Sequence, residues 1–387
     1  MITTLAVQNY RSLRRLVVGL GRLTVVTGAN GTGKSSLYRA LRLLADSARN
    51  GSVAALAREG GLPSTLWAGP EVTGKAVRAG EHPLQGTVRR GPVSLRLGFA
   101  SDDFGYAIDF GLPGPSGSAF GLDPEIKREA VWAGPFLRPA GLLADRSNTA
   151  LRIREGRSWL SVPGALAYYD SMLSEYTDPE RAPEILTVRE RIRSWRFYDH
   201  LRTDVDAPVR VAQVGTRTPV LGADGADLAA ALQTIQEIGD HEALDTAIEA
   251  AFPGSDLAIG VQSGRFSLLL RQPGLLRPLG AAELSDGTLR YLMWVAALLS
   301  PRPPALLVLN EPESSLHPDL LRPLAGLIVT GSARTQVVVI SHSRALLNAV
   351  DASASELSRI ELVKDLGETR IEGQGRLDEP PWHWPER

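Results

Sequence analysis

The sequence predicts an α/β fold built on a sheet of parallel strands with helices between them. Three short apolar runs indicate the strands, because each is rich in Val or Leu and each is followed directly by glycine or polar residues. These runs occupy residues 23–27, 306–310 and 336–340. Since 387 residues exceed one ordinary core, we also expect two lobes or domains.

Composition narrows the class of protein. A hydrophobic content of 43% with 22% charged residues is typical of a globular chain. The sequence has no cysteine, which excludes disulfides, thiolate catalysis and zinc ribbons and fits a cytoplasmic protein. It starts without a signal peptide, and its most apolar segment, 291–299, is too short to span a membrane, so we expect no membrane association.

The first strand leads into GANGTGKS at 28–35, which fits the phosphate-loop pattern G-x-x-x-x-G-K-S. Its glycines let several backbone N–H groups converge on one anion, at the positive end of a predicted helix. Lys34 would reach the phosphates of ATP, and the Ser35 hydroxyl would bind Mg²⁺. Because strand and helix flank the loop, a chance glycine turn is the weaker interpretation. The residues predicted to bind the nucleotide here are Asn30, Gly31, Gly33, Lys34, Ser35 and Ser36.

A second helix start, LSDGT at 284–288, also suits an anion. Ser285 is a good N-cap, and Gly287 permits a close backbone approach. Taken alone, the same pattern is equally typical of a capped core helix.

The two later strands carry polar residues at their carboxyl ends, where ligands bind in parallel α/β sheets. Asn310 and Glu311 follow the strand at 306–310, and His342 follows the strand at 336–340. A carboxylate such as Glu311 can accept a proton from an attacking water. These side chains therefore predict the chemical half of a nucleotide site.

The order of these motifs resembles the ATP-binding cassette (ABC) superfamily, and most closely its RecF, SMC and OLD-like branch of bacterial AAA family ATPases. The strings ELSDGTLRYL and NEPESSLHPDLL carry the resemblance. It implies an α/β P-loop NTPase fold, an ABC-type ATPase head with a mixed sheet, an antiparallel β subdomain and a helical lobe. No heptad run is long enough for a coiled coil of the SMC kind.

The resemblance implies roles for the residues around the phosphates. Lys34 and Ser35 match ligands of phosphate and magnesium. Ser285 and Gly287 match the signature that contacts the γ-phosphate held by a partner subunit, and Arg11 matches an N-terminal contact to the nucleotide. A signature that serves a partner's phosphate loop implies a homodimer or higher homo-oligomer with ATP at the interface.

The resemblance also implies roles for the acidic end of the sheet. Glu311 matches the catalytic base, His342 matches the switch histidine, and 314–317 match the loop that crosses the dimer interface. The usual pattern has Asp where this chain has Asn310, so a metal ligand keeps its carbonyl oxygen but loses its charge. Unit charges ~4 Å apart attract by about 4 kcal/mol at an effective dielectric of ~20, and Glu313 is the candidate to compensate.

Because Glu311 is intact, we expect slow hydrolysis of ATP, and a non-hydrolysing ATP-dependent scaffold for an effector protein stays the alternative. The nucleotide-binding subunit of a transporter is less favoured, because the phosphate loop and the signature lie so far apart in the sequence. The leading hypothesis is a nucleotide-driven clamp or switch in DNA repair or anti-phage defence. The pathway rests on the resemblance alone.

Residues 1–50 and 281–387 are expected to form the ATPase core, and 51–280 an inserted region of antiparallel β structure and helices. Alternating patterns predict hairpins, and longer patterned runs predict helices. The predicted hairpins are 93–113, 257–270 and 359–373, and the predicted helices are 165–176 and 183–202.

The segment RERIRSWRFYDHLR at 189–202 interleaves five arginines with aromatic residues, a mixture suited to phosphate contact and base stacking. An amphipathic helix with a solvated charged face explains the same letters, and the net charge of −1 gives no overall attraction for nucleic acid. DNA therefore stays a candidate partner. After His342 no room remains for a nuclease domain, so a separate nuclease or effector protein would perform any cleavage.

Overall fold

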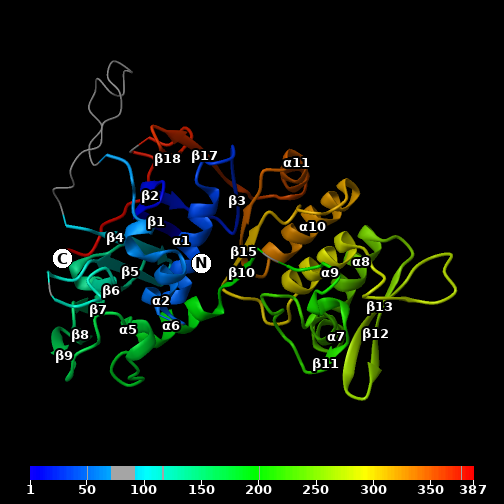
Figure 1. Cartoon of the computed structure of the whole chain (residues 1–387), viewed down its shortest axis with the longest axis horizontal. Coiled ribbons are helices and arrows are strands. Elements are labelled where there is room, and N and C mark those ends of the chain that lie inside the picture. Colours follow the sequence, from blue (N-terminus) through cyan, green and yellow to red (C-terminus); the bar gives the residue numbers. More distant parts are fainter. Residues whose placement is uncertain (50, 71–91, 116, 200, 376) are drawn as a thin grey trace. The chain divides into compact units, whose positions relative to one another are not determined.

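The computed structural model describes residues 1–49, 51–70, 92–115, 117–199, 201–375 and 377–387, and these form two compact units (Figure 1). The chain passes from unit 2 into unit 1 inside strand β3 (Leu23–Gly28), between Val26 and Thr27. These boundaries differ from the core and insertion predicted above, and that division stays a prediction. Unit 1 comprises Met1–Gly21, Thr27–Trp195 and Ile360–Arg387, and unit 2 comprises Arg22–Val26 and Arg196–Arg359.

Unit 1 is built on an antiparallel sheet of eight strands, which Figure 1 shows in blue through cyan to green. The hairpin predicted at 93–113 is confirmed as β4 and β5, and their polar turn is closed by a hydrogen bond of 2.7 Å from the Ser101 hydroxyl to the Phe104 carbonyl oxygen. In spatial order the strands are β2 (Leu13–Gly19), β1 (Ile2–Tyr10), β4 (Leu95–Ser101), β5 (Phe104–Gly111), β6 (Glu125–Ala133), β7 (Leu142–Ser147), β8 (Ala150–Glu155) and β9 (Ser158–Ser161).

Helices of unit 1 pack on this sheet. The helix predicted after the phosphate loop is confirmed as α1, which buries Leu37, Leu41 and Leu44 and contacts β1 and β4. The amphipathic helix predicted from residue 183 is confirmed as far as Ser194, with Ile185, Val188 and Ile192 buried. The helices are α1 (Lys34–Ser47), α2 (Ser52–Arg58), α3 (Gly61–Thr65), α5 (Met172–Glu175) and α6 (Pro183–Ser194), and a 3₁₀ turn, η1, spans Pro139–Gly141.

Two helix predictions are wrong in part. The helix expected at 165–176 is reduced to α5, because the buried ion pair of Arg146 and Glu129 holds this backbone in another shape. The helix expected at 183–202 ends at Ser194, and strand β10 (Arg196–Tyr198) follows in unit 2. Phe197 and Tyr198 are buried in β10, because aromatic side chains suit a packed strand and β10 pairs in parallel with β15.

Unit 2 contains the parallel sheet predicted from the three apolar runs, with one further strand, in the order β10, β15, β16 and β3. Asn310 of β15 pairs with Ile340 of β16, which pairs with Val26 of β3, so the carboxyl ends of the three strands are level. Helix α9 is buried along nearly its whole length, as expected of a core helix. These elements are β15 (Leu306–Asn310), β16 (Gln336–Ile340), α9 (Asp286–Leu298), α10 (Leu321–Ser332), α11 (Arg344–Ser353) and the 3₁₀ turn η3 (Pro318–Leu320).

Other elements of unit 2 contribute to the hydrophobic core that contains α9. The hairpin predicted at 257–270 is confirmed as β12 and β13 of a small antiparallel sheet, and α7 and α8 share the core with α9. The elements are α7 (Leu228–Ile238), α8 (His241–Ala251), β11 (Gln213–Val214), β12 (Asp256–Gln262), β13 (Arg265–Arg271), β14 (Leu279–Gly280) and the 3₁₀ turn η2 (Pro208–Arg210).

The terminal hairpin predicted at 359–373 is confirmed as β17 (Ser358–Asp365) and β18 (Glu368–Ile371). The longest helix of the described residues is α1, with 14 residues, which agrees with the absence of a long coiled coil. In the same part of the chain, every helix falls short of the length and hydropathy that crossing a membrane requires.

Candidate functional site

The phosphate loop of unit 1 has the backbone that its glycines suggested. Gly28, Gly31 and Gly33 have φ values of 142°, 79° and 109°, a region that favours glycine. A Cβ on Gly33 would lie 2.2 Å from the Thr369 hydroxyl oxygen, and a Cβ on Gly28 would lie 2.3 Å from the Leu362 carbonyl oxygen. At these two positions the terminal hairpin therefore excludes any side chain.

The predicted phosphate ligands are placed at the start of α1. The Lys34 ammonium donates hydrogen bonds of 2.6 Å to the Gly28 carbonyl and 3.0 Å to the Ala29 carbonyl, so it lies across the loop. No side chain caps α1, which leaves the first-turn N–H groups open to an anion. Asn30, Gly31 and Ser35 are exposed, and Ser36 is half-buried. This arrangement fits a nucleotide phosphate.

Thr369 of β18 holds the phosphate loop through hydrogen bonds, and no sequence pattern predicted this role. Its hydroxyl donates to the Thr32 carbonyl at 2.6 Å and lies 2.8 Å from the Ser12 hydroxyl oxygen. Its backbone N–H donates to the Ser12 carbonyl at 2.8 Å. The terminal hairpin and the β1–β2 turn thus hold the phosphate loop together.

Arg11 lies in that turn, with a left-handed backbone at φ 51°. Its guanidinium pairs with the Glu59 carboxylate at 2.8 Å, and the Tyr10 hydroxyl donates to the same carboxylate at 2.6 Å. In this structure Arg11 therefore joins the turn to the segment after α2, and the predicted contact to the nucleotide stays a prediction.

In unit 2, the predicted acid and histidine lie next to each other. Glu311 follows β15 with φ 49°, and its N–H donates to the Ile340 carbonyl at 2.8 Å. Non-glycine residues in this region cluster at functional sites, because the backbone cost must be offset by the surrounding structure. The His342 Nδ1 lies 3.4 Å from the Glu311 Oε1, and both side chains are about half exposed, at 53% and 44%. Both groups are therefore accessible to a substrate and a water molecule.

Glu313 binds the loop after β16. The suggestion that its charge replaces the one missing at Asn310 finds no support in these contacts. Its Oε1 accepts hydrogen bonds from the Ser341 hydroxyl at 2.6 Å and from the N–H groups of His342 and Ser343, both at 3.2 Å. The side chain is 8% exposed, and its second oxygen has no partner among the described residues. Glu313 thus fixes the backbone that presents His342.

The signature segment has the predicted cap. The Ser285 hydroxyl accepts a hydrogen bond of 3.1 Å from the Thr288 N–H at the start of α9, and Ser285 is exposed. A Cβ on Gly287 would lie 3.1 Å from the Ser315 carbonyl oxygen, so the glycine permits the close approach that was expected. The start of α9 therefore lies directly against the 314–317 loop.

Two arginines that sequence reasoning missed fix this signature segment. Arg210 donates to the carbonyls of Ala281 at 3.1 Å and Leu284 at 2.8 Å, and it pairs with Asp286 at 2.6 Å. Arg290 donates to the Ser314 carbonyl at 3.1 Å, and burial lowers the pKa of its guanidinium. Arg210 lies outside the motif strings, and Arg290 lies inside ELSDGTLRYL without an expected role. Both donate to backbone carbonyls that are distant in sequence.

A hollow of about 490 Å³ in unit 2 lies between the end of β15 and the start of α9. Asn310 and Glu311, the start of α9 at Asp286, and Ser314 all line it. No three carboxylate or imidazole groups of the described chain gather into a metal site. Mg²⁺ commonly binds through one or two protein oxygens together with substrate phosphates. Ser35 of unit 1 and Asn310 of unit 2 stay the predicted ligands.

The remaining predictions concern single residues. Trp195, Phe197 and Tyr198 are buried, so base stacking by the 189–202 segment finds no support, and the amphipathic-helix alternative holds. His317 is exposed, and its Nδ1 lies 3.3 Å from Asp319 at the start of η3.

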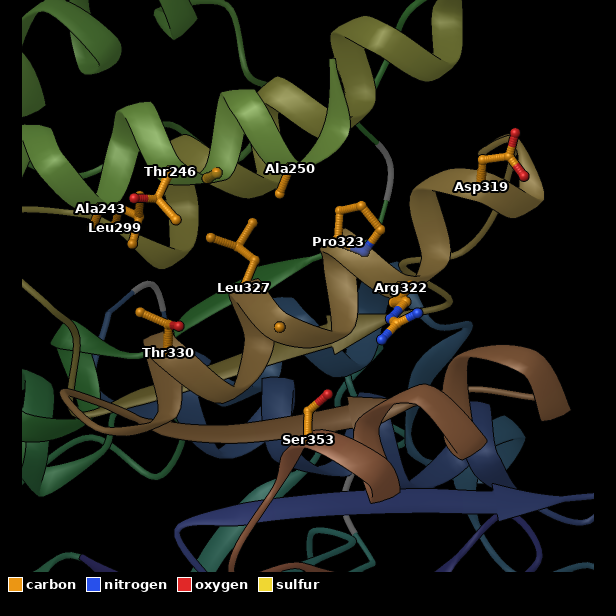
Figure 2. Close-up of a pocket in the computed structure, with 12 residues that line it drawn as sticks. Ala243, Thr246, Ala250, Leu299, Asp319, Arg322, Pro323, Leu327, Thr330 and Ser353 are labelled. Carbon is orange, nitrogen blue, oxygen red and sulfur yellow. The ribbon is translucent and has the colours of Figure 1, made fainter. Parts of the chain in front are cut away.

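A larger hollow of unit 2, of about 650 Å³, lies between α8 and α10 (Figure 2). Ala250 and Leu327 point toward each other across it in Figure 2, and Leu299 lies at its side. None of the predicted site residues lines this hollow. Although it is larger than the hollow beside Glu311, size alone therefore does not identify the candidate site.

Comparison with known proteins identifies a family for this chain. The family described as "AAA domain, putative AbiEii toxin, Type IV TA system" (AAA_21) matches residues 23–348. The chain belongs to this family. Its mixed α/β P-loop fold of the ABC type, predicted from the motifs, is confirmed. A search of curated proteins finds no significant match.

Solved structures of SMC heads resemble the chain. The SMC head domain from Thermotoga maritima has 15% identity and a TM-score of 0.48, over 96% of this chain and 97% of that chain. An SmcHead bound to the C-winged helix domain of ScpA has 14% identity and a TM-score of 0.51, over 96% and 97%. A third structure is the Smc head domain with an extended coiled coil bound to the C-terminal domain of ScpA, derived from Pyrococcus furiosus. It has 13% identity and a TM-score of 0.46, over 96% of this chain and 95% of that chain. At these identities, only the fold is supported.

Proposed function

We propose that this chain binds ATP with Mg²⁺, hydrolyses it slowly, and acts as a nucleotide-driven clamp or switch in the cytoplasm. The observation that carries the proposal is the exposed Glu311 carboxylate beside His342, on a strand whose carboxyl end is level with that of β3. The phosphate loop begins two residues beyond Val26 of β3. A proton acceptor and a phosphate cradle are the two parts that phosphoryl transfer to water requires.

Each residue then has a defined task. The Lys34 ammonium would leave its loop carbonyls and neutralise charge on the β- and γ-phosphates. Ser35 and Asn310 are the residues that would hold the metal, and the metal would neutralise further phosphate charge. Glu311 accepts the proton of the attacking water, and His342 donates a hydrogen bond toward the γ-phosphate. Glu313 keeps His342 in place through the backbone.

We further propose that two copies assemble around the nucleotide. Ser285 and Gly287 of each copy would face the γ-phosphate held by Lys34 of its partner, as in the superfamily that the motifs resemble. Arg210 and Arg290 would keep each signature segment in the required shape. DNA repair or anti-phage defence is the proposed setting, with DNA a candidate ligand and a separate nuclease or effector protein delivering the output.

Phosphate release by the purified chain with Mg²⁺-ATP tests the proposal, alongside Lys34→Ala and Glu311→Gln and with or without double-stranded DNA. We expect slow release that both substitutions abolish, while Glu311→Gln still binds ATP and forms the dimer. Release that survives Glu311→Gln would show that another group accepts the proton.

Asn310 favours a second candidate function, a scaffold that binds ATP and dimerises without turnover. The missing charge weakens support for the metal, so the bound state would be the functional output. Dimerisation by ATP with phosphate release no faster than in Lys34→Ala would support this alternative over the first.

A further inference from the structure

Unit 1 contains a hollow of about 610 Å³ that none of the predicted site residues lines. It lies between α2, the loop after β5 and the segment before α5, and we call it the aromatic-acidic pocket. Its lining residues are Gly51, Val53, Ala54, Ala57, Pro113, Ser118, Phe120, Asp123, Pro124, Glu125, Tyr168, Tyr169 and Asp170.

Three large aromatic side chains of this pocket are exposed. Phe120 is 71% exposed, Tyr168 is 47% exposed and Tyr169 is 59% exposed. Side chains of this size usually bury most of their area, and they dominate the energetics of protein interfaces. A cluster of them around a hollow marks an interaction site rather than scattered surface residues.

The segment that carries the two tyrosines is held rigidly. Arg146 and Glu129 form a fully buried ion pair of 2.8 Å, and Arg146 also donates to the carbonyls of Ala167, at 2.7 Å, and Asp170. These bonds take up the backbone that a helix at 165–176 would need, which explains why that predicted helix does not form.

Glu129 and β6 hold the same segment at further points. The Glu129 carboxylate accepts hydrogen bonds from the Ser171 hydroxyl at 2.6 Å and the Met172 N–H at 2.9 Å. The Ile126 N–H donates to the Tyr168 carbonyl at 2.7 Å. Tyr168 and Tyr169 are thus presented on a fixed backbone, so a ligand would bind them with little loss of backbone entropy.

The described residues that line the pocket carry net negative charge, from Asp123, Glu125 and Asp170. No Lys or Arg is among its described lining residues, and Glu125 is paired with Lys127 at 2.5 Å. Asp123 and Asp170 form no ion pair with any described residue. Partial burial and the neighbouring Glu175 raise the pKa of Asp170, so a cation placed here would stabilise its charged form.

We propose that the aromatic-acidic pocket docks a segment of a partner protein in which arginine or lysine side chains alternate with aliphatic ones. Guanidinium and ammonium groups stack on tyrosine rings and pair with carboxylates, and aliphatic side chains fill the space between Ala54, Ala57 and Pro124. Nucleic acid is the disfavoured ligand, because the uncompensated carboxylates repel phosphates. The proposal is independent of ATP hydrolysis.

A peptide-display selection on the purified full chain tests this proposal. A random peptide library is selected for binding and counter-selected against Tyr168→Ser/Tyr169→Ser, and the enriched peptides are synthesised with a fluorescent label. Their affinities are then measured for the wild type, for the tyrosine variant and for Asp123→Asn/Asp170→Asn. Leu377→Ser and Glu180→Gln, at exposed positions of the same unit outside the pocket, are the matched controls.

We expect enriched peptides that carry basic residues among aliphatic ones. Their affinity should fall about tenfold or more in both pocket variants and change less than about twofold in the controls, at an unchanged melting temperature. Failure to obtain peptides that distinguish the wild type from the tyrosine variant would overturn the proposal, and so would enrichment of acidic peptides.

Two other ligands are measured in parallel. Binding of a labelled single-stranded oligonucleotide that is lost in the tyrosine variant would replace the proposal with a nucleic-acid site. A shift from dimer to monomer in the same variant, measured by light scattering without nucleotide, would instead assign the pocket to a second copy of this chain.

Discussion

Asn310 at the end of β15 and Glu313 just after it lie three residues apart and have separate tasks. Asn310 ends β15 and lines the hollow beside Glu311, whereas Glu313 turns inward to the backbone of His342. From the sequence alone, the carboxylate of Glu313 could replace the charge that Asn310 lacks. The contacts show that Glu313 instead accepts hydrogen bonds from Ser341, His342 and Ser343.

Asn310→Asp should restore the charge that the usual pattern has. If about a third of the ~4 kcal/mol attraction survives compensation, the Mg²⁺ concentration for half-maximal phosphate release should fall about tenfold. Asn348→Asp makes the same change on an exposed face of α11 and should leave the Mg²⁺ dependence unchanged. An unchanged Mg²⁺ dependence in Asn310→Asp would place the metal away from this residue.

Glu313→Ala should destabilise the protein, because it leaves the Ser341 hydroxyl and two backbone N–H groups without their acceptor. We expect a loss of about 1–3 kcal/mol in the free energy of unfolding, measured by urea denaturation. Glu313→Gln keeps a carbonyl oxygen and should lose less, and Glu356→Ala, at an exposed site, should lose under about 0.5 kcal/mol. Equal losses in the alanine and glutamine variants would contradict the assigned hydrogen bonds.

At the scale of elements, the phosphate loop depends on β18. Gly33→Ala would place a Cβ 2.2 Å from the Thr369 hydroxyl oxygen, whereas Gly31→Ala would meet nothing within 4 Å. Both positions have positive φ, so both substitutions add backbone strain of about 1–2 kcal/mol. Gly33→Ala should cost more than Gly31→Ala and abolish binding of a fluorescent ATP analogue. Equal costs in urea denaturation would show that strain alone matters.

The sequence predicted those elements whose structure depends on residues close together in the chain. The phosphate loop, the Ser285 cap and the hairpins at 93–113, 257–270 and 359–373 follow from residue spacing over short stretches. The segment at 165–176 could not be predicted, because Arg146 holds it from another strand. The roles of Thr369, Arg210 and Arg290 could not be predicted for the same reason. Each contacts backbone atoms of residues remote in sequence, and backbone contacts leave no trace in residue types.

At the scale of the whole molecule, the proposed dimer pairs the phosphate loop of one copy with the signature of the other. Placing Lys34→Ala and Arg210→Ala on separate chains of a heterodimer would leave one composite site with both halves intact. Placing both on one chain, opposite a wild-type chain, would leave none. Turnover of purified heterodimers should therefore be about half of the wild type in the first case and near background in the second.

Equal turnover in the two heterodimers would contradict a signature that acts on the partner. Arg265→Ala is the matched control for Arg210→Ala, because Arg265 donates to the Ala212 carbonyl on an exposed part of unit 2. Melting temperatures of all variants would separate loss of assembly from loss of folding.

The bond between Thr369 and Thr32 joins residues 337 positions apart. A ribosome therefore makes Thr32 of the phosphate loop 337 residues before Thr369 of its support in β18. Because a growing chain folds as its parts emerge, the loop must wait, without its final shape, until the terminal hairpin has been synthesised. The phosphate loop therefore lacks its hydrogen bond to β18 until synthesis has passed residue 369.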